Sequence, residues 1–248
     1  MDYKQPEVIY EDEYIAVIGK PAGLIVNRAD TAKDVETLQD WVDNKLKIKN
    51  SKLKITDETK DFLERSGIVH RLDKETSGLL IIARDYISFL DLQKQFKQGR
   101  VEKTYVALVH GKITLPEGEI NVPIGRLPWD RRKFGVIPAG RESQTFYKVL
   151  EYKKIKYDKK EEDLTLVELY PKTGRTHQIR VHLRYLGFPV VGDELYAGRK
   201  NFKNDRKLLN RHFLHAEKIK FYHPQSEEIL EFESPLPQEL VDFLSPLT

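Results

Sequence analysis

The chain of 248 residues contains no cysteine. Disulfide bonds, thiolate catalysis and cysteine-bound zinc or iron–sulfur sites are therefore excluded. No stretch of the sequence approaches the ~20 consecutive apolar residues that a membrane-spanning helix needs. The first residues, MDYKQPEVIYEDE, are polar and acidic and lack the layout of a signal peptide. Together these absences predict a cytoplasmic protein.

The chain also has little net charge. Its 42 basic and 39 acidic residues leave a formal charge of +3, which is too small to indicate nucleic-acid binding. An RNA-binding surface would have to come from local clustering of lysine and arginine. Hydrophobic residues make up 40% of the chain, enough for a large core. The composition thus predicts a globular protein and leaves its function open.

One short segment carries a candidate catalytic group. Residues 70–78 have the sequence HRLDKETSG, which places Asp73 in a polar turn. The apolar runs 67–69 and 79–82 flank this turn, and we expect both to be buried strands. Asp73 should therefore lie at the end of a sheet, near surroundings of low dielectric constant. The alternative is a turn residue that only accepts hydrogen bonds from backbone N–H groups.

The predicted elements favour an α+β fold around a mainly antiparallel sheet. Strands outnumber helices and follow one another as hairpins, and no repeat or break in composition marks a second domain. We expect one domain over residues 1–248. Helices are predicted at 37–46, 86–98, 175–186 and 237–244. Strands are predicted at 8–18 (a hairpin), 67–69, 79–82, 101–111, 144–152, 164–170, 213–221 and 228–233.

Three segments are predicted to be loops, namely 45–61, 153–163 and 198–207. Residues 112–142 are rich in proline and glycine and should form short hairpins. Within them, Arg131 and Arg132 belong to a basic stretch with interleaved aromatic residues from Arg126 to Arg141. Such a stretch is a candidate RNA-binding surface. The alternative is an ordinary exposed hairpin.

A second polar cluster follows the predicted strand 164–170, and both clusters resemble signatures of one family. HRLDKETSG (70–78) resembles the catalytic motif of the RluA-type pseudouridine synthases, and GRTHQIRVHL (174–183) resembles their second signature. Further matches in the same order are KPAGL (20–24), KTYVALV (103–109), GDELY (192–196), LHA (214–216), HP (223–224) and SPLP (234–237). The resemblance covers residues 8 to 245.

The resemblance implies a fold as well as a reaction. It implies one pseudouridine synthase catalytic domain, with a mixed, mainly antiparallel sheet, flanking helices and a central active-site cleft. Many relatives carry a small RNA-binding domain of the S4 type before this core. Because the resemblance begins near residue 8, we expect no separate RNA-binding domain here.

The implied activity is isomerisation of specific uridines in ribosomal RNA or transfer RNA to pseudouridine. The implied reaction needs no redox step, metal or nucleotide, so no cofactor and no metal are expected. The resemblance implies that Asp73 is the catalytic carboxylate, acting as a nucleophile or as a base. It implies that Tyr105 stacks on the flipped uracil and that Arg175 pairs with Asp73. A guanidinium in that position would keep the carboxylate ionised.

RNA contacts are predicted for four arginines. Arg71 lies two residues before Asp73, and Arg180 lies in the second signature. The other two are Arg131 and Arg132. The expected partner is therefore RNA, and the expected oligomeric state is a monomer. Which RNA is modified is not predicted, because the signatures report only the reaction type. We assign specificity to residues 45–61, 126–141 and 198–207.

Other interpretations of these residues remain. A non-catalytic RNA-binding or RNA-folding protein on the same scaffold is the main alternative. A glycosidase would need two carboxylates facing the bond, and only Glu75 lies near Asp73 in sequence. His177 and His182 are five residues apart, which does not fit a helical zinc pair with a spacing of four. We interpret them, with His70, as structural residues.

Overall fold

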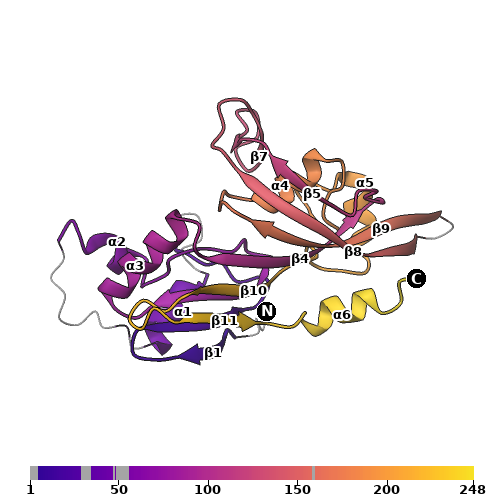
Figure 1. Ribbon diagram of the computed structural model, residues 1–248. Helices are drawn as coiled ribbons and strands as arrows, with labels where there is room; N and C mark the ends of the chain where they lie inside the picture. Colours follow the sequence, from indigo (N-terminus) through magenta and orange to yellow (C-terminus); the bar gives the residue numbers. More distant parts are fainter. Residues whose placement is uncertain (1–4, 29–34, 47, 49–55, 158–159) are drawn as a thin grey trace. The chain divides into compact units, whose positions relative to one another are not determined.

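The computed structural model describes residues 5–28, 35–46, 48, 56–157 and 160–248 (Figure 1). The chain divides into two compact units. Unit 1 comprises Met1–Glu102 and Lys218–Ser234, and unit 2 comprises Lys103–Glu217 and Pro235–Thr248. No helix in the described part of the chain has both the length and the apolar character needed to cross a bilayer.

Unit 1 is built on an antiparallel sheet. Its strands are β1 (Glu7–Glu11), β2 (Ile15–Lys20), β3 (Ser77–Ala83), β10 (Leu214–Tyr222, in this unit from Lys218) and β11 (Ile229–Glu233). They lie in the order β1-β2-β3-β10, and β11 pairs with β10. The register of β2 and β3 places Lys20 opposite Gly78, at the end of β3 that follows the Asp73 turn.

Three helices accompany this sheet: α1 (Leu38–Lys45), α2 (Lys60–Glu64) and α3 (Tyr86–Lys97). The side chain of Thr37 caps α1 by accepting a hydrogen bond from the backbone of Asp40. Asp85 caps α3 in the same way, with Ser88 as donor at 2.9 Å. Both helices were predicted, and both predictions are confirmed to within two residues. Phe62 of α2 packs with α3 and with one face of the sheet.

Unit 2 contains a second antiparallel arrangement. Its strands are β4 (Glu102–His110), β5 (Glu117–Asn121), β8 (Gln144–Tyr157) and β9 (Lys160–Pro171), in the order β4-β9-β8-β5. The short strands β6 (Ile124–Arg126) and β7 (Phe134–Val136) form a separate hairpin. The helices are α4 (Gln178–Tyr185), α5 (Arg199–Asp205) and α6 (Gln238–Leu244).

Successive residues of β4 point to opposite faces of the sheet. Val106 and Leu108 contribute to one buried cluster, which includes Phe243 of α6. Ala107 and Val109 contribute to another, which includes Ile179 and Leu183 of α4. The two helices therefore cover opposite faces of β4. The predicted α+β fold with a mainly antiparallel sheet is confirmed.

Some local predictions are wrong. The segment 153–163 was expected to be a charged loop, but β8 continues to Tyr157 and β9 begins at Lys160. Opposite charges face each other across these strands, as in the Lys154–Glu161 ion pair at 2.6 Å, and Ile155 and Tyr157 are buried. Alternation of buried and charged side chains is typical of a half-buried strand.

Other boundaries also shift. Residues 67–69 are buried, but their only β contact among the described residues is an isolated bridge between Ile68 and Ile82. The predicted loop 198–207 contains α5, and α2 begins within the predicted loop 45–61, of which 47 and 49–55 lie outside the described residues. The helix predicted at 175–186 begins at Gln178, so Arg175 lies in the preceding turn.

Candidate active site

The Asp73 turn is anchored by its own backbone. The amide of Thr76 donates to the carbonyl oxygen of Asp73 at 3.1 Å, which closes a turn just before β3. Leu72 and Thr76 are buried, whereas Asp73 is half-buried and Arg71 is exposed. The local sequence therefore buries the ends of the turn and leaves the Asp73 carboxylate partly accessible.

A buried ammonium group fixes this turn to the neighbouring loop. Lys20 is only 2% exposed. Its Nζ donates to the carbonyl oxygens of Pro21 at 2.8 Å, Leu24 at 2.8 Å and Lys74 at 3.0 Å. The amide of Gly23 also donates to Lys74 O, at 2.9 Å. All three ammonium protons have acceptors, as a buried charge requires. The residue after Asp73 is thus bound to the end of β2.

Sequence reasoning did not identify this role for Lys20. The only signal was a lysine at the end of an apolar strand, followed by a Pro-Ala-Gly turn. Lysines are almost always exposed, so a buried one cannot be told from its neighbours in sequence alone.

His70 has a structural role in unit 1. Its Nε2 accepts a hydrogen bond from the Ile81 amide at 2.9 Å, and its ring centroid lies 4.7 Å from that of Phe96. His182 is fully buried in unit 2, where Nδ1 contacts the hydroxyl of Thr145 at 2.9 Å. Burial lowers the pKa of His182 to about 4. Among the described residues, no three His, Cys, Asp or Glu side chains gather as a metal site.

Arg175 lies in unit 2, in the turn before α4. Its backbone amide donates to Oε1 of Gln178 at 2.9 Å, and its Nε donates to the carbonyl oxygen of Glu142 at 3.0 Å. Burial, together with the positive charge of Arg141, lowers the pKa of Arg175. The negative charge of Glu142 opposes this shift, so Arg175 has both a cation and a carboxylate as neighbours.

Tyr105 lies on β4 in unit 2. It is half-buried and sits opposite Leu169 of β9, against the cluster that α4 covers. Two residues before it, burial and the charge of Lys172 lower the pKa of Lys103 to about 8. Strand β4 therefore carries Tyr105 and, two residues before it, a lysine whose pKa is lowered.

The Tyr196 hydroxyl group links the β6–β7 hairpin to the turn before α4, beside apolar contacts between the hairpin and α4. The oxygen of Tyr196 accepts a hydrogen bond from the Phe134 amide at 3.0 Å and lies 2.9 Å from Nδ1 of His177. The rings of Phe134 and His177 meet edge to face, 5.6 Å apart. His177 has a φ of +56°, which is uncommon for a residue other than glycine. These contacts fix the hairpin to the turn that carries Arg175.

The predicted RNA-binding arginines differ in exposure. Arg71, Arg131 and Arg132 are exposed, and the side chain of Arg132 is 81% exposed. Arg180 is buried: its Nε and Nη2 donate to the two carboxylate oxygens of Asp193 at 2.7 and 2.9 Å. The prediction of an RNA contact by Arg180 does not agree with this burial. Its guanidinium instead neutralises a carboxylate inside unit 2.

Asp73 belongs to unit 1, whereas Tyr105 and Arg175 belong to unit 2. The structure therefore describes the surroundings of each residue within its own unit. The predicted pairing of Asp73 with Arg175, and the predicted central cleft, stay predictions.

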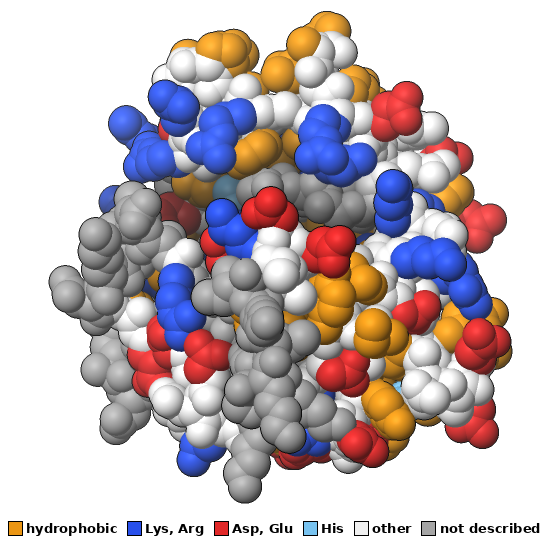
Figure 2. Space-filling model, turned by 90° about the vertical axis from the view of Figure 1, so that its left-hand side faces the viewer, with side chains coloured by type: hydrophobic (Ala, Val, Ile, Leu, Met, Phe, Trp, Pro, Cys, Tyr) orange, Lys and Arg blue, Asp and Glu red, His pale blue; other side chains and the backbone are white. Residues whose placement is uncertain are grey.

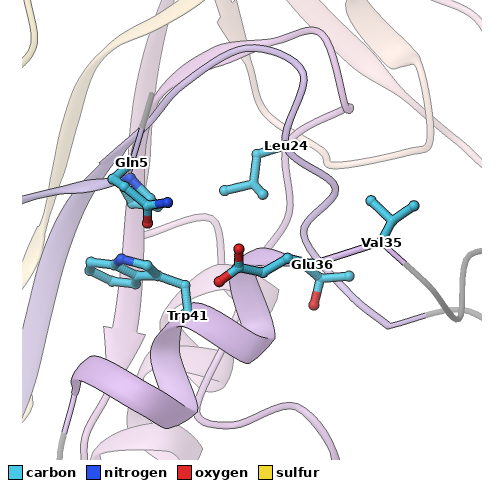
Figure 3. Close-up of a pocket in the computed structure, with 7 residues that line it drawn as sticks. Gln5, Leu24, Val35, Glu36 and Trp41 are labelled. Atoms are coloured by element: carbon cyan, nitrogen blue, oxygen red, sulfur yellow. The ribbon is translucent and has the colours of Figure 1, made fainter. Parts of the chain in front are cut away.

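A pocket in unit 1 is lined by none of the predicted site residues. Gln5 and Trp41 stand on one side of it, and Leu24 and Val35 stand on the other (Figure 3). Its lining is mostly apolar and includes one acidic side chain, Glu36. Leu24 connects it to the candidate site, since the carbonyl of this residue is bound by Lys20.

Comparison with known proteins agrees with the signatures. The family model described as RNA pseudouridylate synthase matches residues 14–185. A protein of Aquifex aeolicus, named an uncharacterized RNA pseudouridine synthase, is 39% identical over 224 residues, covering 88% of this chain and 65% of the relative. The ribosomal large subunit pseudouridine synthase D of Pseudomonas aeruginosa is 37% identical over 226 residues, covering 88% of this chain and 64% of the relative.

Solved structures agree on the fold. Human RNA pseudouridylate synthase domain containing 1 is 28% identical, with a TM-score of 0.69 over 94% of this chain and 84% of that one.

The chain spans slightly less than two thirds of the length of the two bacterial relatives. The family match nevertheless includes Asp73, Tyr105 and Arg175. The chain belongs to the RluA-type family of RNA pseudouridine synthases.

Proposed function

We propose that the protein converts specific uridines of RNA to pseudouridine. In this isomerisation the bond between uracil N1 and ribose C1′ breaks, the uracil turns, and C5 bonds to C1′. The proton lost from C5 is balanced by the proton gained at N1, so the reaction needs neither an oxidant nor a reductant. Family membership supports this activity, and Asp73, Tyr105 and Arg175 all lie within the matched residues 14–185.

Asp73 is the proposed catalytic carboxylate, acting on the ribose as nucleophile or base. Tyr105 is proposed to stack on the uracil and to assist removal of the C5 proton. Arg175 is proposed to pair with Asp73 and keep it ionised. The half-buried position of Arg175 supports an anionic partner for this guanidinium.

The observation that carries the proposal is the anchoring of the Asp73 turn by Lys20. A fully engaged, buried ammonium holds the backbone next to a partly accessible carboxylate. Catalytic groups need this kind of support, because small errors in position cost large factors in rate. A turn that only ended a strand would gain little from burying a charge.

RNA is the proposed partner, contacted by the exposed Arg71, Arg131 and Arg132. Ribosomal RNA is the first candidate substrate, because a relative is named a ribosomal large subunit pseudouridine synthase. Transfer RNA is the second. We further propose that the protein is a cytoplasmic monomer and that residues 1–248 form a single catalytic domain.

The test is tritium release from RNA that carries [5-³H]uridine, because C5 loses its hydrogen in the reaction. Bulk ribosomal RNA and bulk transfer RNA, both unmodified, are supplied separately to the wild type and to Asp73→Asn. Release by the wild type alone is expected, from ribosomal RNA first. No release from either RNA by a folded wild type would overturn the proposed activity.

A further inference from the structure

We propose that the indole of Trp129, at the turn of the β6–β7 hairpin, stacks on an unpaired base of the RNA substrate. The inference rests on the proposed function and narrows it. It assigns the substrate class as RNA with unstacked nucleotides at or near the target uridine, and excludes a continuous duplex.

The first observation is the exposure of Trp129. Trp129 is 77% exposed, which is the largest exposed fraction among the large hydrophobic residues that the structure describes. The other tryptophan, Trp41, is 6% exposed. An indole ring buries a large apolar area when it binds another molecule. A solvent-exposed indole at a hairpin turn is therefore accessible to a binding partner.

The second observation is the charge around Trp129. Residues 126–133 contain four cations, which are Arg126, Arg131, Arg132 and Lys133, and one carboxylate, Asp130. Asp130 lies 3.4 Å from Arg132 and 3.9 Å from Lys133, so its charge is locally neutralised. Figure 2 shows Lys and Arg side chains gathered beside exposed hydrophobic ones near the top of the view. Cations next to an exposed aromatic ring favour a polyanion with stackable bases over a protein surface.

The third observation is that the turn is already ordered. The Leu127 amide donates to Lys133 O at 3.0 Å, and the Lys133 amide donates to Asp130 O at 2.9 Å. The guanidinium of Arg126 donates to Arg131 O at 2.7 Å. At its root the hairpin is bound to Tyr196. A ring presented on an ordered turn loses little conformational entropy on binding.

Stacking requires a base with a free face. In a continuous helix both faces of each base are covered by neighbours, and proteins that stack aromatic rings on RNA use loops, bulges and ends. The uridine itself has to leave its stack for the reaction. An unpaired base of the same RNA is therefore the expected partner of Trp129.

Fluorescence tests the contact directly. In a Trp41→Phe protein, Trp129 is the only tryptophan. The probes are a single-stranded oligouridylate of about 12 nucleotides, a length suited to one ssRNA-binding surface, and its duplex with oligoadenylate. We expect saturable quenching by the single strand and much weaker quenching by the duplex. Unchanged emission with the single strand, or equal quenching by both, would overturn the inference.

Kinetics supply the second measurement. Trp129→Ala should raise KM for the accepted RNA roughly 5- to 100-fold, the usual effect of losing one stacked base, with kcat nearly unchanged. The matched control is Tyr185→Ala, which removes another exposed aromatic ring of unit 2 and should change neither constant. An active wild type with an unchanged KM in Trp129→Ala would refute the stacking and leave the proposed activity standing. Quenching without any tritium release would support the stacking and refute the activity.

Discussion

The buried ammonium of Lys20 offers the sharpest test of how the fold supports the site. In Lys20→Met the side chain keeps its length and loses its charge. Two carbonyl oxygens, of Pro21 and Leu24, then lose this donor, while Lys74 O keeps the Gly23 amide. Each buried carbonyl left unsatisfied costs about 1–3 kcal/mol. Relief from burying the charge offsets part of this, so we expect a net loss of about 2–4 kcal/mol in the free energy of unfolding.

The assay is urea unfolding of Lys20→Met beside a matched control, Lys60→Met. Lys60 lies 3.8 Å from Glu64 on the surface, with 60% of its side chain exposed. Such a pair contributes well under about 1 kcal/mol. Tritium release is then measured without urea, at a temperature at which both variants are folded. Only Lys20→Met should have a lower kcat, because the Asp73 turn loses its anchor. Equal stability of the two variants, or full kcat in Lys20→Met, would refute the reasoning.

Three further predictions concern unit 2. His182 is neutral in the folded protein, where burial lowers its pKa from 6.5 to about 4. Between pH 6.5 and about pH 4 the unfolded chain therefore binds more protons than the folded protein, so the free energy of unfolding decreases as the pH falls. Urea unfolding should show a loss of about 2 kcal/mol between pH 7 and pH 5 that His182→Gln lacks. Tyr196→Phe should raise KM for RNA, because the hairpin loses its bond to the α4 turn, whereas Tyr157→Phe, which also loses a buried hydrogen bond, should alter stability and leave KM unchanged. Arg180→Met should destabilise the protein by about 3–5 kcal/mol, because the buried Asp193 carboxylate loses its cation and keeps, among the described residues, only the Leu195 and Tyr196 amides as donors. A folded fraction that binds RNA normally would confirm the structural role.

Local features of the fold were predictable because their causes lie within a few residues. Thr37 and Asp85 each precede an apolar stripe with helical spacing, and each caps the helix that was expected. The hairpin of β8 and β9 was cut short in the prediction, because its outer half alternates charged residues with only two buried ones, Ile155 and Tyr157. The high proportion of charged residues there predicted a loop, whereas the alternation of buried and charged residues is typical of a strand.

The candidate site was predictable only where a motif named the residue. Asp73, Tyr105 and Arg175 were assigned by resemblance, whereas the roles of Lys20 and Arg180 depend on tertiary partners. Lys20 binds carbonyls up to 54 positions away, and Arg180 pairs with a carboxylate 13 positions on. Neither partnership leaves a local pattern in the sequence. The burial of Arg180, which was predicted to contact RNA, could therefore not be inferred from its neighbours.

The central claim is that a single carboxylate, Asp73, performs the reaction. Glu75 is the natural comparison, because it lies two residues away on the same turn and its side chain is 38% exposed. The decisive measurement is tritium release under single-turnover conditions by Asp73→Asn and Glu75→Gln, with both proteins shown to be folded and to bind the RNA. The account predicts no release by Asp73→Asn and near-normal release by Glu75→Gln. Release by Asp73→Asn at the wild-type rate would contradict it.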